Sequence, residues 1–159
     1  MNLIKPNIKL TSEWVTGFLD AEGCFHVSFT KRPYRKTKIE VRPSLSVTQL
    51  PKSLKILEGL QSFFQCGGIR FSKKDGLYRY EIRSVPDIMK KVIPHFQQCP
   101  LVSPKYEDFL IFKVVCTRVY ENKHVTGSQL EEILRLAYSM NAAGKRKHSL
   151  NDLLKLIAS

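Results

Sequence analysis

The sequence is short of acidic residues. It has 14 Asp and Glu against 26 Lys and Arg, which leaves a formal net charge of +12. This imbalance favours a polyanionic partner, nucleic acid first and an anionic membrane surface second. No apolar run approaches the roughly 20 residues of a membrane-spanning helix, and residues 1–14 lack the apolar core and cleavage site of a signal peptide. We therefore expect an intracellular protein that does not enter a membrane.

Closely spaced metal-binding pairs are also missing. The four cysteines, at positions 24, 66, 99 and 116, form no Cys-x-x-Cys pair, and the histidines show no His-x-x-x-His spacing. Zinc sites rely on such pairs, so we expect no zinc and four reduced cysteines. Hydrophobic residues make up 43% of the 159 residues, enough for the core of one domain. We interpret 1–159 as a single domain with its core over about 10–142, followed by a basic linker and short helical tail over 143–159.

The apolar periodicity changes along the chain from helical to strand-like and back. It predicts a first helix that starts at Thr11 or Ser12 and runs to about Ala21. Strict alternation predicts half-buried strands over 24–32 and 38–49, and a strand pair over 69–84 that turns at 74–76. Further helices are expected from Pro51 to Cys66, after Pro86 with a kink or an early end at Pro94, over 104–120, from Thr126 to about 140, and over 149–158.

This order of elements predicts an α+β fold, an antiparallel sheet with helices on one face and a bare, polar opposite face. Basic side chains hold phosphates, and short polar side chains read base edges, so we interpret the bare face as DNA-binding. An ordinary solvated sheet face is the alternative. The candidate DNA-binding residues are His26, Ser28, Thr30, Arg32, Arg35, Lys36, Lys38, Glu40, Arg42, Ser44, Ser46, Thr48, Arg70, Ser72, Lys73, Lys74, Arg79, Glu81 and Arg83.

One decapeptide, WVTGFLDAEG over 14–23, places a glycine inside an apolar helix and two carboxylates at its end. The glycine costs about 1 kcal/mol relative to alanine, and the carboxylates oppose the helix dipole. Gly17 and Ala21 are four residues apart, so a second helix can approach that side closely. Two such helices would bring carboxylates together around a divalent cation such as Mg2+. The alternative is a buried helix with Gly23 as its C-cap and two solvated acids.

The decapeptide resembles the defining motif of the LAGLIDADG homing endonucleases, with Gly17, Asp20, Glu22 and Gly23 at the matching places. Similar stretches follow in the family's order at 47–49, 100–109 and 121–133. The resemblance implies an αββαββα core with a saddle-shaped sheet and extra C-terminal helices. It also implies site-specific, staggered cleavage of double-stranded DNA with Mg2+, for which Mn2+ substitutes, and an intron-bearing organelle, mitochondrion or chloroplast, as the location.

Roles for individual residues follow from the same resemblance. Glu22 is expected to bind the metal together with the Ala21 carbonyl, and Gln49 to position water or metal. Lys105 is expected to stabilise phosphate charge or to organise the attacking water. Asp20 is expected to belong to the catalytic group by capping or supporting the end of the helix.

The sequence contains one motif and no internal repeat. The resemblance therefore implies a homodimer on a long, near-palindromic DNA site, with Trp14, Gly17, Phe18 and Ala21 in the dimer interface. Alternatively, the chain is half of a protein with two motifs. A non-cleaving nucleic-acid binder, such as a maturase with intron RNA as its partner, is the alternative function, and the retention of both motif acids favours the enzyme.

Overall fold

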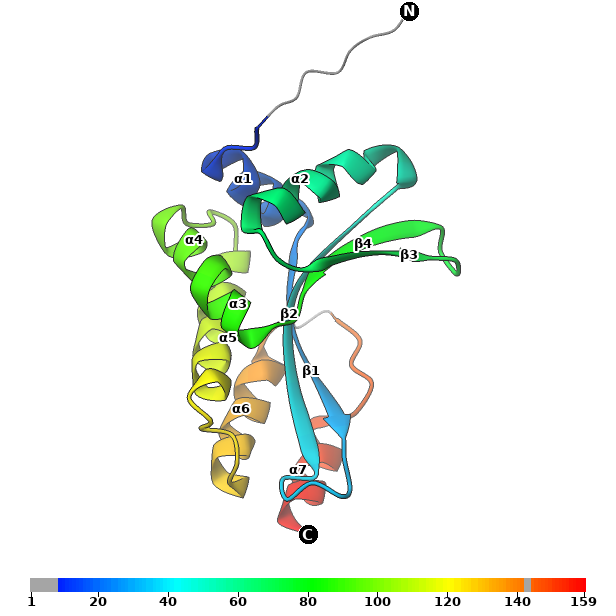
Figure 1. Cartoon of the computed structure of the whole chain (residues 1–159). Coiled ribbons are helices and arrows are strands. Elements are labelled where there is room, and N and C mark those ends of the chain that lie inside the picture. Colours follow the sequence, from blue (N-terminus) through cyan, green and yellow to red (C-terminus); the bar gives the residue numbers. More distant parts are fainter. Residues whose placement is uncertain (1–8, 142–143) are drawn as a thin grey trace, which may run out of the picture.

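A single antiparallel sheet lies at the centre of the computed structural model, which describes residues 9–141 and 144–159 (Figure 1). Its strand order is β1-β2-β4-β3. The strands are β1 (Cys24–Lys31), β2 (Ile39–Gln49), β3 (Gly68–Ser72) and β4 (Leu77–Ile82). The predicted alternation is confirmed, because Phe25, Val27 and Phe29 of β1 are buried while the residues between them are not.

The longer helices occupy the segments that the sequence predicted. They are α1 (Ser12–Glu22), α2 (Leu54–Phe64), α5 (Lys105–Tyr120) and α6 (Gly127–Ser139), with a 3-10 turn, η1 (Pro51–Ser53), ahead of α2. The Thr11 hydroxyl accepts a hydrogen bond from the Trp14 N–H at 3.3 Å, which caps α1. Thr126 and Gln129 form a capping box on α6. Helix α1 extends one residue further than predicted, to Glu22.

The helix expected after Pro86 becomes irregular before Pro94 but does not end there. It consists of α3 (Val85–Asp87), a π-helical turn η2 (Ile88–Val92) and α4 (Ile93–Gln98). Proline lacks an N–H, and its ring clashes with the carbonyl four residues earlier in a regular α-helix. The wider π-turn directly before Pro94 accommodates both effects, so the helix continues to Gln98.

The core lies between one face of the sheet and the helices. The rings of Phe25, Phe96, Phe109 and Phe112 meet there, with the Phe25 centroid 5.1–5.5 Å from each of the others. These contacts join β1 to α4 and α5, and large buried aromatic side chains dominate core energetics. No helix among the described residues covers the opposite face. In Figure 1 the β3–β4 hairpin projects away from the lower part of β1 and β2, so this uncovered face is concave.

The basic tail packs against the edge of the sheet. Asn141 donates from Nδ2 to the Phe25 carbonyl at 2.7 Å, and Arg146 donates from Nη1 to the Val27 carbonyl at 2.9 Å. These two side chains thus occupy carbonyl groups on the outer edge of β1. Helix α7 (Leu150–Ala158) follows and packs on α6 through the fully buried Leu153. The predicted boundary at 142–143 lies outside the described residues.

Candidate active site and nucleic-acid interface

Helix α1 has one face in the core and one face in solvent. The outward face carries the residues predicted for dimer packing, which are Trp14, Gly17, Phe18 and Ala21. The rings of Trp14 and Phe18 stack, with centroids 5.1 Å apart. A Cβ atom added at Gly17 would meet no atom within 4 Å. Among residues 9–141 and 144–159, no contact explains the glycine, despite its cost of about 1 kcal/mol within a helix.

The Asp20 carboxylate joins the end of α1 to the loop before α5. It accepts hydrogen bonds from the backbone N–H groups of Val102 at 2.9 Å and Ser103 at 3.0 Å, and from the Ser103 hydroxyl. Burial by itself raises the pKa of Asp20. The hydrogen bonds from Ser103 and Val102, with the nearby charge of Lys105, outweigh that effect and hold the pKa below its usual value. Asp20 is therefore ionised and engaged within its own chain.

Lys105, the first residue of α5, caps the other side of the same helix end. Its Nζ donates to the carbonyls of Leu19 at 3.1 Å and Gly23 at 2.6 Å. A cation at this position complements the negative end of the α1 dipole. This contact explains how a helix can end in two acids, because a lysine distant in sequence supplies the opposing charge.

Gly23 gives the helix end the space that it needs. Its backbone is extended, with φ −75° and ψ 158°. A Cβ atom at this position would lie 2.7 Å from the Leu19 carbonyl oxygen, closer than real side chains come. Gly23 is thus the residue after α1, as the alternative interpretation required, and steric room explains the glycine.

Glu22 is exposed at the end of α1, beside the end of β2. The last residue of β2, Gln49, donates from Nε2 to Glu22 Oε2 at 3.4 Å. The described residues contain no cluster of three His, Cys, Asp or Glu side chains that could hold a metal ion. One carboxylate and the Ala21 carbonyl offer oxygen donors only, which suits Mg2+ or Ca2+ if water, phosphate or a second chain completes the ligands.

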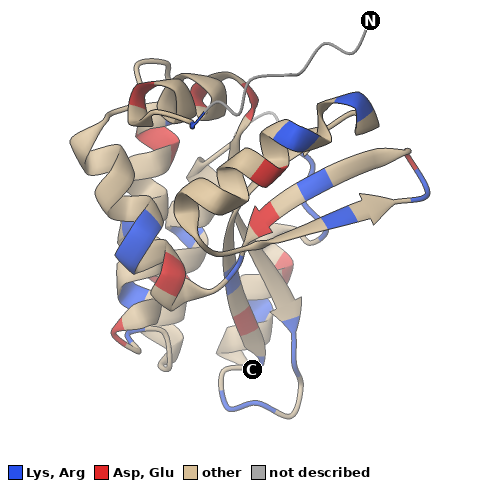
Figure 2. Ribbon diagram, turned by 45° about the horizontal axis from the view of Figure 1, so that its top comes forward, with Lys and Arg blue, Asp and Glu red and all other residues tan. Residues whose placement is uncertain are grey.

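The sheet register gathers most of the predicted DNA-binding residues on the uncovered face. Arg70 lies opposite Arg79, which lies opposite Thr48, so one row crosses three strands. Figure 2 shows further basic residues at the β1–β2 connection and at the β3–β4 turn, the two ends of the sheet. These are the segments of Arg32, Arg35, Lys36 and Lys38, and of Lys73 and Lys74.

Ser44 is the least accessible of the predicted DNA-binding residues. It lies on the expected face but is only 6% exposed. Its short side chain lies opposite the longer His26 in the β1–β2 register. Ser28 is also partly engaged, because its hydroxyl donates to the carbonyl of its partner Arg42 at 3.2 Å. The alternation of the sequence predicted the face of the sheet on which these residues lie, but not how exposed their side chains are.

Both acids on the uncovered face are paired with arginines. Glu40 Oε2 accepts from Arg32 Nε at 3.0 Å. Glu81 Oε2 accepts from Arg70 Nη2 at 2.7 Å and lies 2.9 Å from Arg83 Nε. Their carboxylates hold the arginines of this surface, whereas the sequence suggested that they would contact DNA directly.

A buried cluster that sequence analysis missed anchors the inward face of α1. The Thr16 hydroxyl donates to the Cys99 carbonyl at 2.9 Å. Since this uses the only hydroxyl proton, His95 Nε2, also 2.9 Å from the oxygen, must be the donor in that contact. Burial lowers the pKa of His95, although the charge of Glu13 opposes this. A threonine at an apolar position of the helix was the one available signal.

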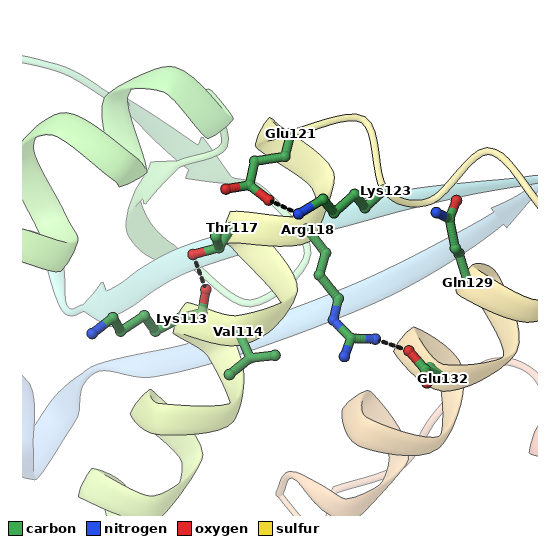
Figure 3. Close-up of a pocket in the computed structure, with 8 residues that line it drawn as sticks. All are labelled: Lys113, Val114, Thr117, Arg118, Glu121, Lys123, Gln129 and Glu132. Atoms are coloured by element: carbon green, nitrogen blue, oxygen red, sulfur yellow. Dashed lines mark hydrogen bonds and ion pairs between the residues drawn. The ribbon is translucent and has the colours of Figure 1, made fainter.

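One surface hollow is remote from the motif. It has a volume of ≈ 450 Å3 and lies between the second half of α5 and α6 (Figure 3). Lys105, which contacts α1, is at the opposite end of α5. Two ion pairs, Arg118–Glu132 and Lys123–Glu121, neutralise most of its charge. Its lining residues are Lys113, Val114, Thr117, Arg118, Glu121, Lys123, Gln129 and Glu132.

Comparisons with known proteins agree with this geometry. The crystal structure of a homing endonuclease, I-TnaI, has a TM-score of 0.87 to this fold at 32% identity, covering 94% of this chain and 99% of that one. I-SmaMI, bound to an uncleaved DNA target in the presence of calcium ions, has a TM-score of 0.81 at 27% identity, covering 86% of this chain and 47% of that one.

The sequence comparisons name the same kind of protein. "Probable intron-encoded endonuclease 2" of Neurospora crassa is 32% identical over 133 residues, which are 83% of this chain. This chain spans only 29% of that relative's length. Residues 15–116 match the family described as LAGLIDADG endonuclease, and they include most of the motif helix, the whole sheet and Lys105. On both fold and sequence, the chain belongs to the LAGLIDADG endonuclease family.

Proposed function

We propose that two copies of this chain form a site-specific homing endonuclease that cleaves double-stranded DNA with a divalent metal, Mg2+ or in its place Mn2+. The observation that carries the proposal is the end of α1. Glu22 is exposed beside Gln49, on the helix whose outward face has a glycine where an added Cβ would meet no described atom within 4 Å. The intron-encoded relative supports an origin in an organellar intron, in a mitochondrion or chloroplast.

The homodimer is proposed through α1. Two such helices would pack along Trp14, Gly17, Phe18 and Ala21. This packing would cover the stacked aromatic pair, and the small residues would let the two helix backbones approach closely. A two-fold axis there makes the interface self-complementary and the DNA site near-palindromic. The described helix α1 carries the single motif, and two copies would supply the two carboxylates that surround the metal.

Each chain contributes half of the active site. Glu22 and the Ala21 carbonyl hold the cation, and Gln49 fixes the Glu22 carboxylate through the bond described above. Asp20 and Lys105 anchor the helix end that carries Glu22, one from the loop side and one from the carbonyl side. The metal, when bound, activates water and stabilises charge on the leaving oxygen.

The concave face would hold the DNA. Lysines and arginines at the two ends of the sheet are placed for phosphates, while the row of Thr48, Arg79 and Arg70 is placed for base edges. One such surface on either side of the dimer axis accounts for a long target. Two active centres across the minor groove give staggered cuts.

A cleavage selection tests the activity. Purified protein with Mg2+ is mixed with a library of random duplexes, with Ca2+ as the non-cleaving control, and the cut ends are sequenced. We expect cut sites with two-fold related halves. Glu22→Gln should bind the selected site and leave it uncut, whereas Glu13→Gln, an exposed acid at the start of the same helix, should cut normally. Cleavage by Glu22→Gln would remove Glu22 from the mechanism.

A second substitution tests the dimer. Gly17→Ala places its methyl group in open space within the single chain, so the monomer should gain about 1 kcal/mol from helix propensity. The same methyl group would enter the helix pair and weaken association. Sedimentation velocity measures the association, and urea unfolding at low protein concentration measures the monomer. A variant that gains stability and still dimerises fully would argue against packing at Gly17.

A further inference from the structure

Glu81 is the most covered charged group on the DNA-facing side of the sheet. Its side chain is 8% exposed, while those of its partners Arg70 and Arg83 are 62% and 49% exposed. On β4 it lies opposite Ser46 on one side and Gly68 on the other. Short side chains at both positions leave room for the two arginines to reach over the acid.

The geometry of the two contacts leaves each arginine free to bind something else. Both use the same oxygen, Glu81 Oε2. Arg83 approaches through Nε, so its two terminal Nη groups stay available as a fork. Arg70 uses Nη2 alone, so Nε and Nη1 remain. A guanidinium with two free donors is the group that reads guanine O6 and N7.

Stability is a weak reason to keep an acid on this surface. Ion pairs with one largely exposed partner contribute little to folding. A carboxylate facing phosphates opposes DNA binding, because it cancels part of the positive charge that attracts the backbone. The cost makes sense if the acid restricts the arginines to one orientation before DNA arrives, since ordering a long side chain otherwise weakens binding.

We infer that Glu81 is a positioning residue that sets base specificity by orienting Arg70 and Arg83. The inference rests on the proposed function, because it concerns how the same surface selects its DNA site. Glu81 thereby increases base selectivity and decreases the sequence-independent affinity for DNA. Its partners contact bases, and Glu81 itself contacts only the partners.

The other end of the sheet repeats the device, which supports the inference independently. Glu40 of β2 lies opposite Thr30 of β1, and its Oε2 holds Arg32, again through Nε at 3.0 Å. Tyr34 also accepts from Arg32, at 3.4 Å. Glu40 and Glu81 thus each hold an arginine through one carboxylate oxygen, at opposite ends of the DNA-facing surface, although Glu40 is more exposed, at 27%.

The experiment is a binding selection from a random duplex library in Ca2+, with base preference scored at each position. The full chain is compared with Glu81→Gln and Arg70→Lys. Glu81→Gln should lose preference about 5-fold or more at one or two positions in each half-site. Arg70→Lys, which keeps the charge but not the fork, should relax an overlapping position. Binding to unselected duplex should stay equal or rise in Glu81→Gln, as a negative charge is removed.

Two controls separate positioning from a general loss of structure. Glu58→Gln removes an acid from an exposed position on α2, where no ion pair is formed among the described residues, and should leave every preference unchanged. Glu81→Asp keeps the charge but shortens the reach, so it should relax the same positions as Glu81→Gln. Unaltered preferences in both Glu81 variants would overturn the inference.

A comparison in a double-variant background tests whether Glu81 contacts a base directly. If Glu81 acts through its partners, Glu81→Gln should have no further effect in an Arg70→Gln/Arg83→Gln background. An undiminished effect there would mean that Glu81 contacts a base itself, and the inference would be wrong. Wild-type protein that selects no sequence would overturn the proposed function as well, which is a distinct result from selection without Glu81 dependence.

Discussion

Lys105→Met offers the sharpest test of how the end of α1 is built. The substitution keeps a long side chain but removes the charge and the two hydrogen bonds to the carbonyls of Leu19 and Gly23. The Leu19 carbonyl keeps a partner, because it also accepts from the Gly23 N–H at 2.9 Å. The main loss is therefore one charged hydrogen bond, to the Gly23 carbonyl.

The magnitude follows from these contacts. A hydrogen bond from a charged group contributes about 1.5–3 kcal/mol, and a cation at a helix C-terminus about 0.3–1 kcal/mol. We expect Lys105→Met to lower the free energy of unfolding by about 2–4 kcal/mol. At this chain length that corresponds to a fall in Tm of roughly 5–15 °C. The protein should remain folded, since domains are stable by about 5–15 kcal/mol.

Urea unfolding at one fixed protein concentration measures the loss, and binding in Ca2+ with cleavage in Mg2+ follows the function. We expect slower cleavage with DNA affinity nearly kept, because the helix end that carries Glu22 is loosened while the sheet is untouched. Lys113→Met is the matched control, the same change on the same helix at a lysine distant from α1, and should alter stability little. Unchanged stability with abolished cleavage would refute the capping role and leave Lys105 free to act at phosphate.

Three further predictions concern the buried contacts of α1 and the edge of β1. Thr16→Val should cost about 1–3 kcal/mol in urea unfolding, because the His95 N–H and the Cys99 carbonyl lose their shared partner. Burial lowers the pKa of His95, against a smaller effect of Glu13, so the unfolded chain takes up the proton first. The stability that neutral His95 contributes should therefore be full above about pH 6.5 and be lost as the pH falls below that value. The free energy of unfolding should fall less steeply with pH in His95→Gln. Equal slopes in the two proteins would contradict this. Arg146→Ala should uncover the edge of β1 and increase light scattering on mild heating, whereas Lys145→Ala, exposed beside it, should not.

Local patterns predicted the elements well, because their causes are local. The Thr11 cap and the alternation of β1 depend on residues that are neighbours in sequence. The irregular turn ahead of Pro94 also follows from the chemistry of one residue, although its π-helical form was not predicted. The motif placed Glu22 correctly at the end of a helix beside Gln49.

Contacts between distant segments explain what the sequence missed. Lys105 reaches Gly23 across 82 positions, and periodicity carries no information about such a pairing. The link from Glu81 to Arg70 depends on the register of β3 against β4 and on side-chain direction. Ser44 lies on the predicted face, but its neighbours across the strands decide its exposure.

The chain has one tryptophan, and it lies outside the core. Trp14 is 42% exposed on the outward face of α1, stacked on Phe18. Its emission therefore reports on that face alone, and covering it with a second copy would shift the spectrum to the blue and protect the ring from soluble quenchers. The residues proposed to bind DNA lie on the sheet and its connections, not on α1. The protein thus carries an intrinsic fluorophore that can measure dimer formation separately from DNA binding, without an added label.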